Sequence, residues 1–166
     1  MHAYRTETRE SGSFSFRVEW FYDDDSDAPW DREDGHGPVS DWERRDKKPG
    51  EMILCEDRGS RRFYDFAEAV KIARRDGWNT APHEWPTSGA RAHAAAMNNF
   101  EYLRRWCNDQ WHYCGIVVTL LDVDGEPDSI DASLWGIESE CDDHHADVIK
   151  DLIDECLDQI TATIGA

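Results

Sequence analysis

Residues 142–163 carry two different patterns on one predicted helix, and these patterns limit how the chain folds. Apolar residues recur at steps of three and four and form one stripe: Val148, Ile149, Leu152, Ile153, Cys156, Leu157 and Ile160. Carboxylates recur at the same steps on another face: Asp143, Asp147, Asp151, Asp154 and Asp158. A helix of this kind is stable when its apolar stripe packs against other elements, so the chain must supply a matching apolar surface.

Four segments have the composition of β-strands. Residues 14–22 alternate aromatic or apolar residues with polar ones, which predicts a half-buried strand. Residues 113–122 are the strongest strand candidate, and a turn centred on Asp124-Gly125 leads into a further strand at 130–137. The short apolar run 51–56 predicts the fourth strand.

Two more helices are expected in the middle of the chain. Asp65 has the position of an N-cap with Glu68 three residues later, and Gly77 closes that helix. A longer helix is predicted over residues 88–110, after a linker at 79–89 that contains two prolines. Residues 23–50 form a long polar loop in this interpretation, held in place by two tryptophans, Trp30 and Trp42.

These elements predict a single α+β domain over residues 1–166, in the order β-β-α-α-β-β-α. The strands are expected to form a four-stranded, mainly antiparallel sheet with three helices on one face. A chain of 166 residues is long enough to bury one such core. Its eight Trp, five Tyr and six Phe exclude the class of disordered acidic proteins, which contain few aromatic residues.

Negative charge is concentrated in parts of the sequence. Residues 111–166 contain 14 Asp and Glu against one cation, Lys150, and residues 1–35 contain ten acids against four Arg. Residues 36–110 are nearly neutral, with 12 acids against 13 Lys and Arg. Adaptation to high salt would spread acidic residues over the whole surface, so we favour a surface that binds a positively charged partner. Direct binding to nucleic acid is not expected, because this surface repels phosphates.

Three acidic clusters are the candidate partner-binding residues. The first is the row on the terminal helix, whose carboxylates stand about 5–6 Å apart, close to the spacing of phosphates along a DNA strand, about 6–7 Å. The second is Asp23, Asp24 and Asp25, and the third surrounds the predicted hairpin, with Asp124, Glu126 and Asp128. If the sheet brings both turn regions to one edge, the three clusters merge. A solvated helix face with no further role is the simpler alternative.

The sequence gives little support for metal or catalytic chemistry. The segment from Asp122 to Asp128 lacks the glycine and glutamate positions of a calcium-binding EF-hand. Cys107, His112 and Cys114 do not have the usual spacing of zinc ligands, and the other candidates, Cys141, His144 and His145, do not complete it. We therefore expect no cofactor and no enzyme activity. A metal-dependent nuclease remains the alternative, with Lys71 near Glu68 as its weak candidate.

The environment of the chain is expected to be reducing. Five cysteines are an odd number at irregular spacing, which favours free thiols in a cytoplasm. The N-terminus has no apolar segment typical of a signal peptide, and no apolar run is long enough to cross a membrane.

Several segments resemble a family of small acidic proteins encoded by bacteriophages and prophages. They are GPVSDWERRD (37–46), DRGS (57–60), FYDFAEA (63–69), RRDGW (74–78), WCND (106–109) and SLWGIES (133–139). The resemblance spans residues 20–139 and indicates a source rather than an activity. It implies action in the host cytoplasm during infection. By analogy with DNA mimics that block restriction enzymes or CRISPR complexes, it also implies an inhibitor of host defence.

Together, charge and resemblance predict a non-enzymatic binding protein. Its expected partner is a host protein or ribonucleoprotein complex with a basic nucleic-acid groove, a CRISPR effector or a restriction enzyme. The other alternative is an adaptor that binds through exposed aromatic residues such as Trp111 or Trp135.

Overall fold

The computed structural model describes residues 1–78 and 87–165, and it divides the chain into two compact units. Unit 1 combines Met1–Ser26 with Trp111–Ala166, and unit 2 is Asp27–Gln110. Each unit has its own hydrophobic cluster. This division replaces the single domain with one core that the sequence analysis expected.

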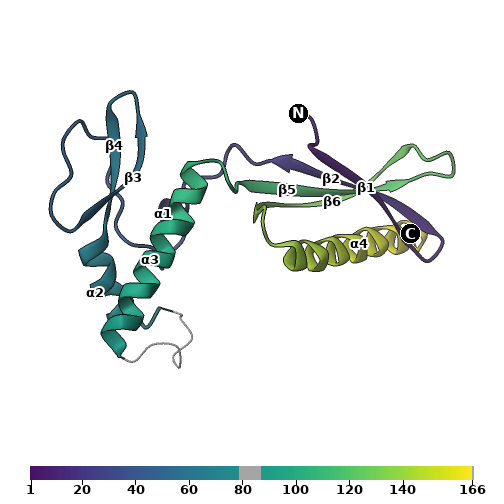
Figure 1. Cartoon of the computed structure of the whole chain (residues 1–166). Coiled ribbons are helices and arrows are strands. Elements are labelled where there is room, and N and C mark those ends of the chain that lie inside the picture. Colours follow the sequence, from purple (N-terminus) through teal and green to yellow (C-terminus); the bar gives the residue numbers. More distant parts are fainter. Residues whose placement is uncertain (79–86, 166) are drawn as a thin grey trace. The chain divides into compact units, whose positions relative to one another are not determined.

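Unit 1 is built on a four-stranded antiparallel sheet (Figure 1). Its strands are β1 (Arg5–Ser11), β2 (Phe14–Tyr22), β5 (Tyr113–Leu121) and β6 (Pro127–Glu138), in the spatial order β1-β2-β5-β6. The alternating residues of β2 send Phe16, Val18 and Trp20 to the buried face. Val18 lies directly opposite Val118 of β5, so both strands present their apolar residues on the same side.

Helix α4 (Asp142–Ile164) packs on that side of the sheet (Figure 1). Its buried residues are His145 and those of the predicted apolar stripe, except that Leu157 is only partly buried. Two polar contacts anchor the start of the helix, because the buried imidazole of His145 accepts a hydrogen bond from Trp20 Nε1 (3.3 Å) and contacts the carbonyl oxygen of Glu138 (2.7 Å). Further along, the thiol of Cys156 donates to the carbonyl of Val118.

Unit 2 contains a two-stranded antiparallel hairpin and three helices among the residues that the structure describes. The strands are β3 (Glu51–Asp57) and β4 (Ser60–Asp65). The helices are α1 (Pro29–Arg32), α2 (Phe66–Asp76) and α3 (Ser88–Cys107). The core joins Leu54 and Tyr64 of the hairpin to Phe100 and Leu103 of α3.

The α+β class and the antiparallel character of the main sheet are confirmed, but helix number and element order differ from the prediction. The observed order is β-β-α-β-β-α-α-β-β-α. Residues 51–56 do form a strand, yet it pairs with β4 in a separate sheet, and β1 takes the expected fourth place in the main sheet. Helix α1 and two isolated bridges, Val39 with Tyr64 and Glu43 with Arg61, fall within the predicted loop 23–50.

Local predictions for the helices agree closely with the structure. Asp65 is the N-cap of α2, its carboxylate accepts from the backbone N–H of Glu68 (3.0 Å), and Gly77 ends the helix in the left-handed conformation. The helix expected at 88–110 ends three residues earlier, at Cys107. The helix expected at 142–163 is α4. Most of the predicted linker 79–89 lies outside the described residues.

Candidate functional site

The charge of the protein is divided between its two units. Unit 1 contains 20 Asp and Glu against 4 Lys and Arg, a formal charge of −16. Unit 2 contains 16 acids against 14 Lys and Arg, a formal charge of −2. The excess of negative charge therefore belongs almost entirely to unit 1. The candidate binding surface is the exposed acidic surface of that unit.

The acidic row on α4 faces solvent. All five of its carboxylates are exposed: Asp143, Asp147, Asp151, Asp154 and Asp158. At about 100° per residue they fall within an arc of roughly 80°, on the side of the helix opposite the buried stripe. The row is about 22 Å long at 1.5 Å per residue. Lys150 pairs with one member of the row, and its Nζ lies 3.1 Å from the carboxylate of Asp154.

The second cluster directly follows the end of β2. Asp24 and Asp25 are exposed, whereas Asp23 is half-buried and its carboxylate accepts from the hydroxyl of Ser26 (2.9 Å). The backbone N–H of Asp23 donates to the carbonyl of Tyr113 (3.0 Å), which fixes the segment to β5. These acids line an open cleft of about 680 Å³ beside the aromatic rings of Tyr22 and Trp135. A positively charged side chain entering this cleft would meet both carboxylates and ring faces.

The third cluster lies at the β5–β6 turn. Asp122 organises that turn, because one of its carboxylate oxygens accepts from the backbone N–H groups of Asp124 and Glu126, both at 2.9 Å. The side chains of Asp124, Glu126 and Asp128 are exposed. Asp122 thus has a structural role, and its neighbours present their charge to solvent.

The three clusters do not meet at one edge of the sheet. Strand β2 runs antiparallel to β5, with Ser15 opposite Leu121 and Tyr22 opposite Cys114. Asp23, Asp24 and Asp25 therefore follow the strand end opposite to the one that carries the β5–β6 turn. Helix α4 connects the two ends, since His145 contacts Trp20 while Gln159 donates to the carbonyl of Asp131 (2.9 Å). The acidic groups of unit 1 form a row with a cluster towards each end of the sheet.

The two tryptophans considered as interface anchors differ in exposure. Trp111 is 2 % exposed and packs edge-on against Tyr113, so it belongs to the core. Trp135 is 39 % exposed, stacks beside Phe21 and covers Gly115. Sequence reasoning missed an aromatic group of Tyr4, Tyr22 and His112, whose ring centroids lie 4.4–5.3 Å apart. This group depends on pairing between distant segments and has no local signal.

The soft metal ligands named from the sequence are dispersed. Cys107 belongs to unit 2, whereas His112 and Cys114 belong to unit 1. His145 is occupied by Trp20 and Glu138. Over residues 1–78 and 87–165, no three His, Cys, Asp or Glu side chains are grouped closely enough to hold a metal ion. Lys71 and Glu68, the nuclease candidate, form an exposed pair at 3.8 Å on α2.

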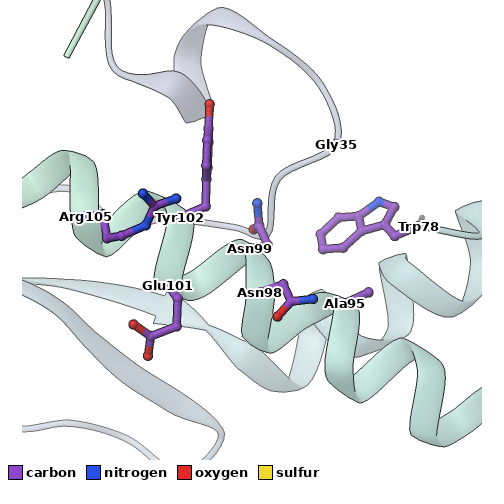
Figure 2. A pocket seen from close by; sticks show the side chains of 8 residues that line it. All are labelled: Gly35, Trp78, Ala95, Asn98, Asn99, Glu101, Tyr102 and Arg105. Carbon is purple, nitrogen blue, oxygen red and sulfur yellow. The ribbon is translucent and has the colours of Figure 1, made fainter. Parts of the chain in front are cut away.

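Unit 2 has an open cleft of about 640 Å³ along α3 (Figure 2). Its lining includes Trp78, Asn98, Asn99, Glu101 and Tyr102. The amide of Asn99 is already used within the fold, because its oxygen accepts from the Tyr64 hydroxyl (2.8 Å) and the backbone N–H of Gly37 (2.9 Å). The cleft offers polar groups for binding, including the carboxylate of Glu101, and the described residues that line it include no Ser, Cys, His or Lys.

Comparison with protein-family models, with curated proteins and with solved structures found no match for this chain. None of the helices in the described part is long and apolar enough to cross a membrane. The case for function therefore rests on the site itself.

Proposed function

We propose that this chain is a phage-encoded, non-enzymatic inhibitor that binds a positively charged nucleic-acid groove of a host defence complex. The partner is a CRISPR effector or a restriction enzyme, and the inhibitor competes with nucleic acid for the groove. The observation that carries the proposal is the solvent-facing row of five carboxylates on α4, in a unit with a formal charge of −16.

The row has the dimensions needed to imitate a phosphate backbone. Its length of about 22 Å follows from the helical rise and corresponds to three or four phosphates at about 6–7 Å each. Lys and Arg side chains that normally contact phosphates would form charge-assisted hydrogen bonds with these carboxylates. The row is also preorganised, because the opposite face of α4 is buried against the sheet, so little conformational entropy is lost on binding.

The absence of balancing cations on α4 supports a binding role over a purely structural one. Like charges three or four residues apart each cost a few tenths of a kcal/mol in a helix. Lys150 is the one Lys or Arg of α4; it pairs with Asp154 and interacts more weakly with Asp151 and Asp147, and the last turn has no basic residue. A helix selected for stability alone would place Lys or Arg at several of these positions.

The experiment that tests the proposal is capture from host lysate, followed by competition with DNA. The test variant changes Asp147, Asp151 and Asp158 to Asn, which leaves the Lys150–Asp154 pair intact. At about 1 kcal/mol for each lost contact, we expect affinity for the captured complex to fall on the order of 100-fold. Duplex DNA should displace the wild-type protein, and added salt should slow its association.

The matched control changes Asp31, Asp34 and Asp41 to Asn, which removes the same charge from exposed positions of unit 2. This control should bind within a few-fold of the wild type. Equal losses in both triple variants would indicate a general charge effect. Capture that survives about 0.5 M salt and the α4 variant would contradict the proposal and favour an interface built on Trp135 and Tyr22.

The enzyme alternative is tested separately. Purified protein is incubated with DNA and Mg²⁺ or Mn²⁺, and we expect no cleavage. Cleavage that a single acidic substitution abolishes would replace the inhibitor proposal with a metal-dependent nuclease.

A further inference from the structure

Unit 2 contains a second cleft, of about 380 Å³, whose wall includes two thiol groups. Cys55 and Cys107 both line it, together with the rings of Trp30, Trp42 and Trp106. Both cysteines are partly exposed. This site is independent of the acidic surface on unit 1.

The fold brings these two sulfur atoms together from distant parts of the chain. Cys55 lies on β3 directly after an irregularity in the β3–β4 register, between Ile53 and Cys55. Cys107 is the last residue of α3. The strand and the helix share one hydrophobic cluster, on which both cysteines pack. Both side chains line the same cleft, and each thiol shifts the pKa of the other.

The environment makes the two thiols unequal. Arg62 is the cross-strand neighbour of Cys55, and its guanidinium lies 5.1 Å from the ring centres of both Trp30 and Trp42. The neighbouring thiol of Cys107, with a smaller effect of the Arg62 charge, lowers the pKa of Cys55 despite its burial. The thiol of Cys55 and burial raise the pKa of Cys107, which also lies at the negative end of the α3 dipole. Cys55 is therefore the better nucleophile.

The other cysteines lack these features. Cys114 and Cys156 are buried in unit 1. Cys141 is an exposed residue. The pKa of its thiol is raised by loss of some solvation and by the neighbouring charges of Glu138, Glu140 and Asp142. In the part of the chain that the structure describes, Cys55 and Cys107 are the cysteines placed for direct bond formation.

We propose that Cys55 and Cys107 are a reversible thiol–disulfide pair, oxidised by a low-molecular-weight disulfide such as oxidised glutathione that enters the tryptophan-lined cleft. The Cys55 thiolate attacks one sulfur of the oxidant, forms a mixed disulfide and releases one glutathione thiolate. Cys107 then loses its proton to solvent and attacks Cys55, which releases the second glutathione thiolate. Two protein thiols are oxidised and one disulfide is reduced to two thiols, so the electrons balance.

The new bond has consequences inside unit 2. It joins the β3–β4 hairpin covalently to the end of α3, which restricts the unfolded chain and raises the unfolding temperature of this unit. It also places a disulfide next to Trp106, which packs edge-on against Trp30 at 5.3 Å between ring centres. Tryptophan fluorescence should therefore fall on oxidation and recover on reduction.

The test treats the folded, full-length protein with oxidised glutathione, quenches with acid and maps the linked peptides by mass spectrometry. We expect one intramolecular link between Cys55 and Cys107, with the loss of two hydrogen atoms from the intact mass. Cys141→Ser is the matched control and should form this link as readily as the wild type. Repeating the reaction in denaturant should abolish the selectivity, because the folded site creates it.

Two single variants test the order of the steps. Cys107→Ser should stop at the mixed disulfide on Cys55, whereas Cys55→Ser should leave Cys107 unmodified. Glutathione found mainly on Cys141 of the folded wild type, or a Cys55–Cys107 link that forms only in denaturant, would overturn the proposal. The wild-type peptide map decides the matter even if one of the variants fails to fold.

Discussion

Gly115 of β5 lies under the indole ring of Trp135, and this contact places the exposed tryptophan. A Cβ atom added at Gly115 would lie 2.1 Å from Cε3 of that ring, far inside van der Waals contact. We expect Gly115→Ala to displace Trp135 and to lower the free energy of unfolding of unit 1 by about 1–3 kcal/mol. Urea denaturation measures this loss, and a red shift in tryptophan emission reports the displaced ring.

The control for this prediction is the same change in a Trp135→Ala background. Without the indole there is no clash, so Gly115→Ala should then cost less than half as much. Equal costs in both backgrounds would show that the glycine is needed for its backbone and not for the ring. The comparison is a double-mutant cycle on one contact.

Single residues also show how far the sequence could define the site. Exposure of the five α4 carboxylates was predictable, because helical periodicity separates them from the apolar stripe. The role of His145 as the hydrogen-bond acceptor of Trp20 was not predictable, since the two residues lie 125 positions apart in the sequence. The position of Cys55 and Cys107 in one cleft was hidden for the same reason. Periodicity gives the direction of a side chain, while its long-range partner depends on the packing of elements.

At the scale of elements, α4 combines a stabilising face with a destabilising one. Asp158 lies in its C-terminal part, where the dipole disfavours negative charge and no basic residue occupies the last turn. We expect Asp158→Lys to stabilise unit 1 by roughly 0.5–1 kcal/mol, because it removes this carboxylate and adds a cation one turn after Asp154. The same change should weaken capture of the proposed partner. Thermal unfolding and the capture assay measure the two effects on one variant.

Thr161→Lys is the control for that variant. It adds a cation to the exposed last turn of α4 without removing a carboxylate of the row. It should raise stability by a few tenths of a kcal/mol and leave most of the binding intact. If both variants lost binding equally, net charge rather than the ordered row would govern recognition.

The strands missed from the sequence share a physical cause. Strand β1 has almost no apolar alternation and is mostly exposed, so backbone pairing with β2 and the contact of Arg5 over Trp20 hold it in place. Strand β4 follows a tight turn at Gly59 and ends at Asp65, the N-cap of α2. The strand is short and has no polar segment between it and the helix, so its pattern does not stand out in the sequence. Predictions based on burial patterns recognise strands that carry a core, and they fail for edge strands and very short ones.

At the scale of the whole molecule, the missed feature is the division into two units. Strong local signals correctly placed α2, α3, α4, β2 and β5. None of them showed that residues 27–110, which separate the two segments of unit 1 in the sequence, form a core of their own. Domain insertion depends on which strands pair across the gap, and β2 pairs with β5 almost a hundred residues later in the sequence. Charge followed the same division, with −16 on unit 1 and −2 on unit 2.

This division predicts that salt acts on the two units differently. Self-repulsion destabilises the compact state of unit 1, and its range is the Debye length, about 30 Å at 0.01 M salt and about 10 Å at 0.1 M. Raising sodium chloride from about 0.01 M to about 0.3 M should stabilise unit 1 by about 1 kcal/mol, which slows amide exchange roughly fivefold. Hydrogen-exchange mass spectrometry on peptides from β5 and α4 measures this change at constant pH and temperature.

Peptides from α3 in the nearly neutral unit 2 are the internal control, and their exchange rates should change little. Equal slowing in both units would indicate a general salt effect. It would contradict the claim that charge repulsion destabilises unit 1, which carries the proposed binding row.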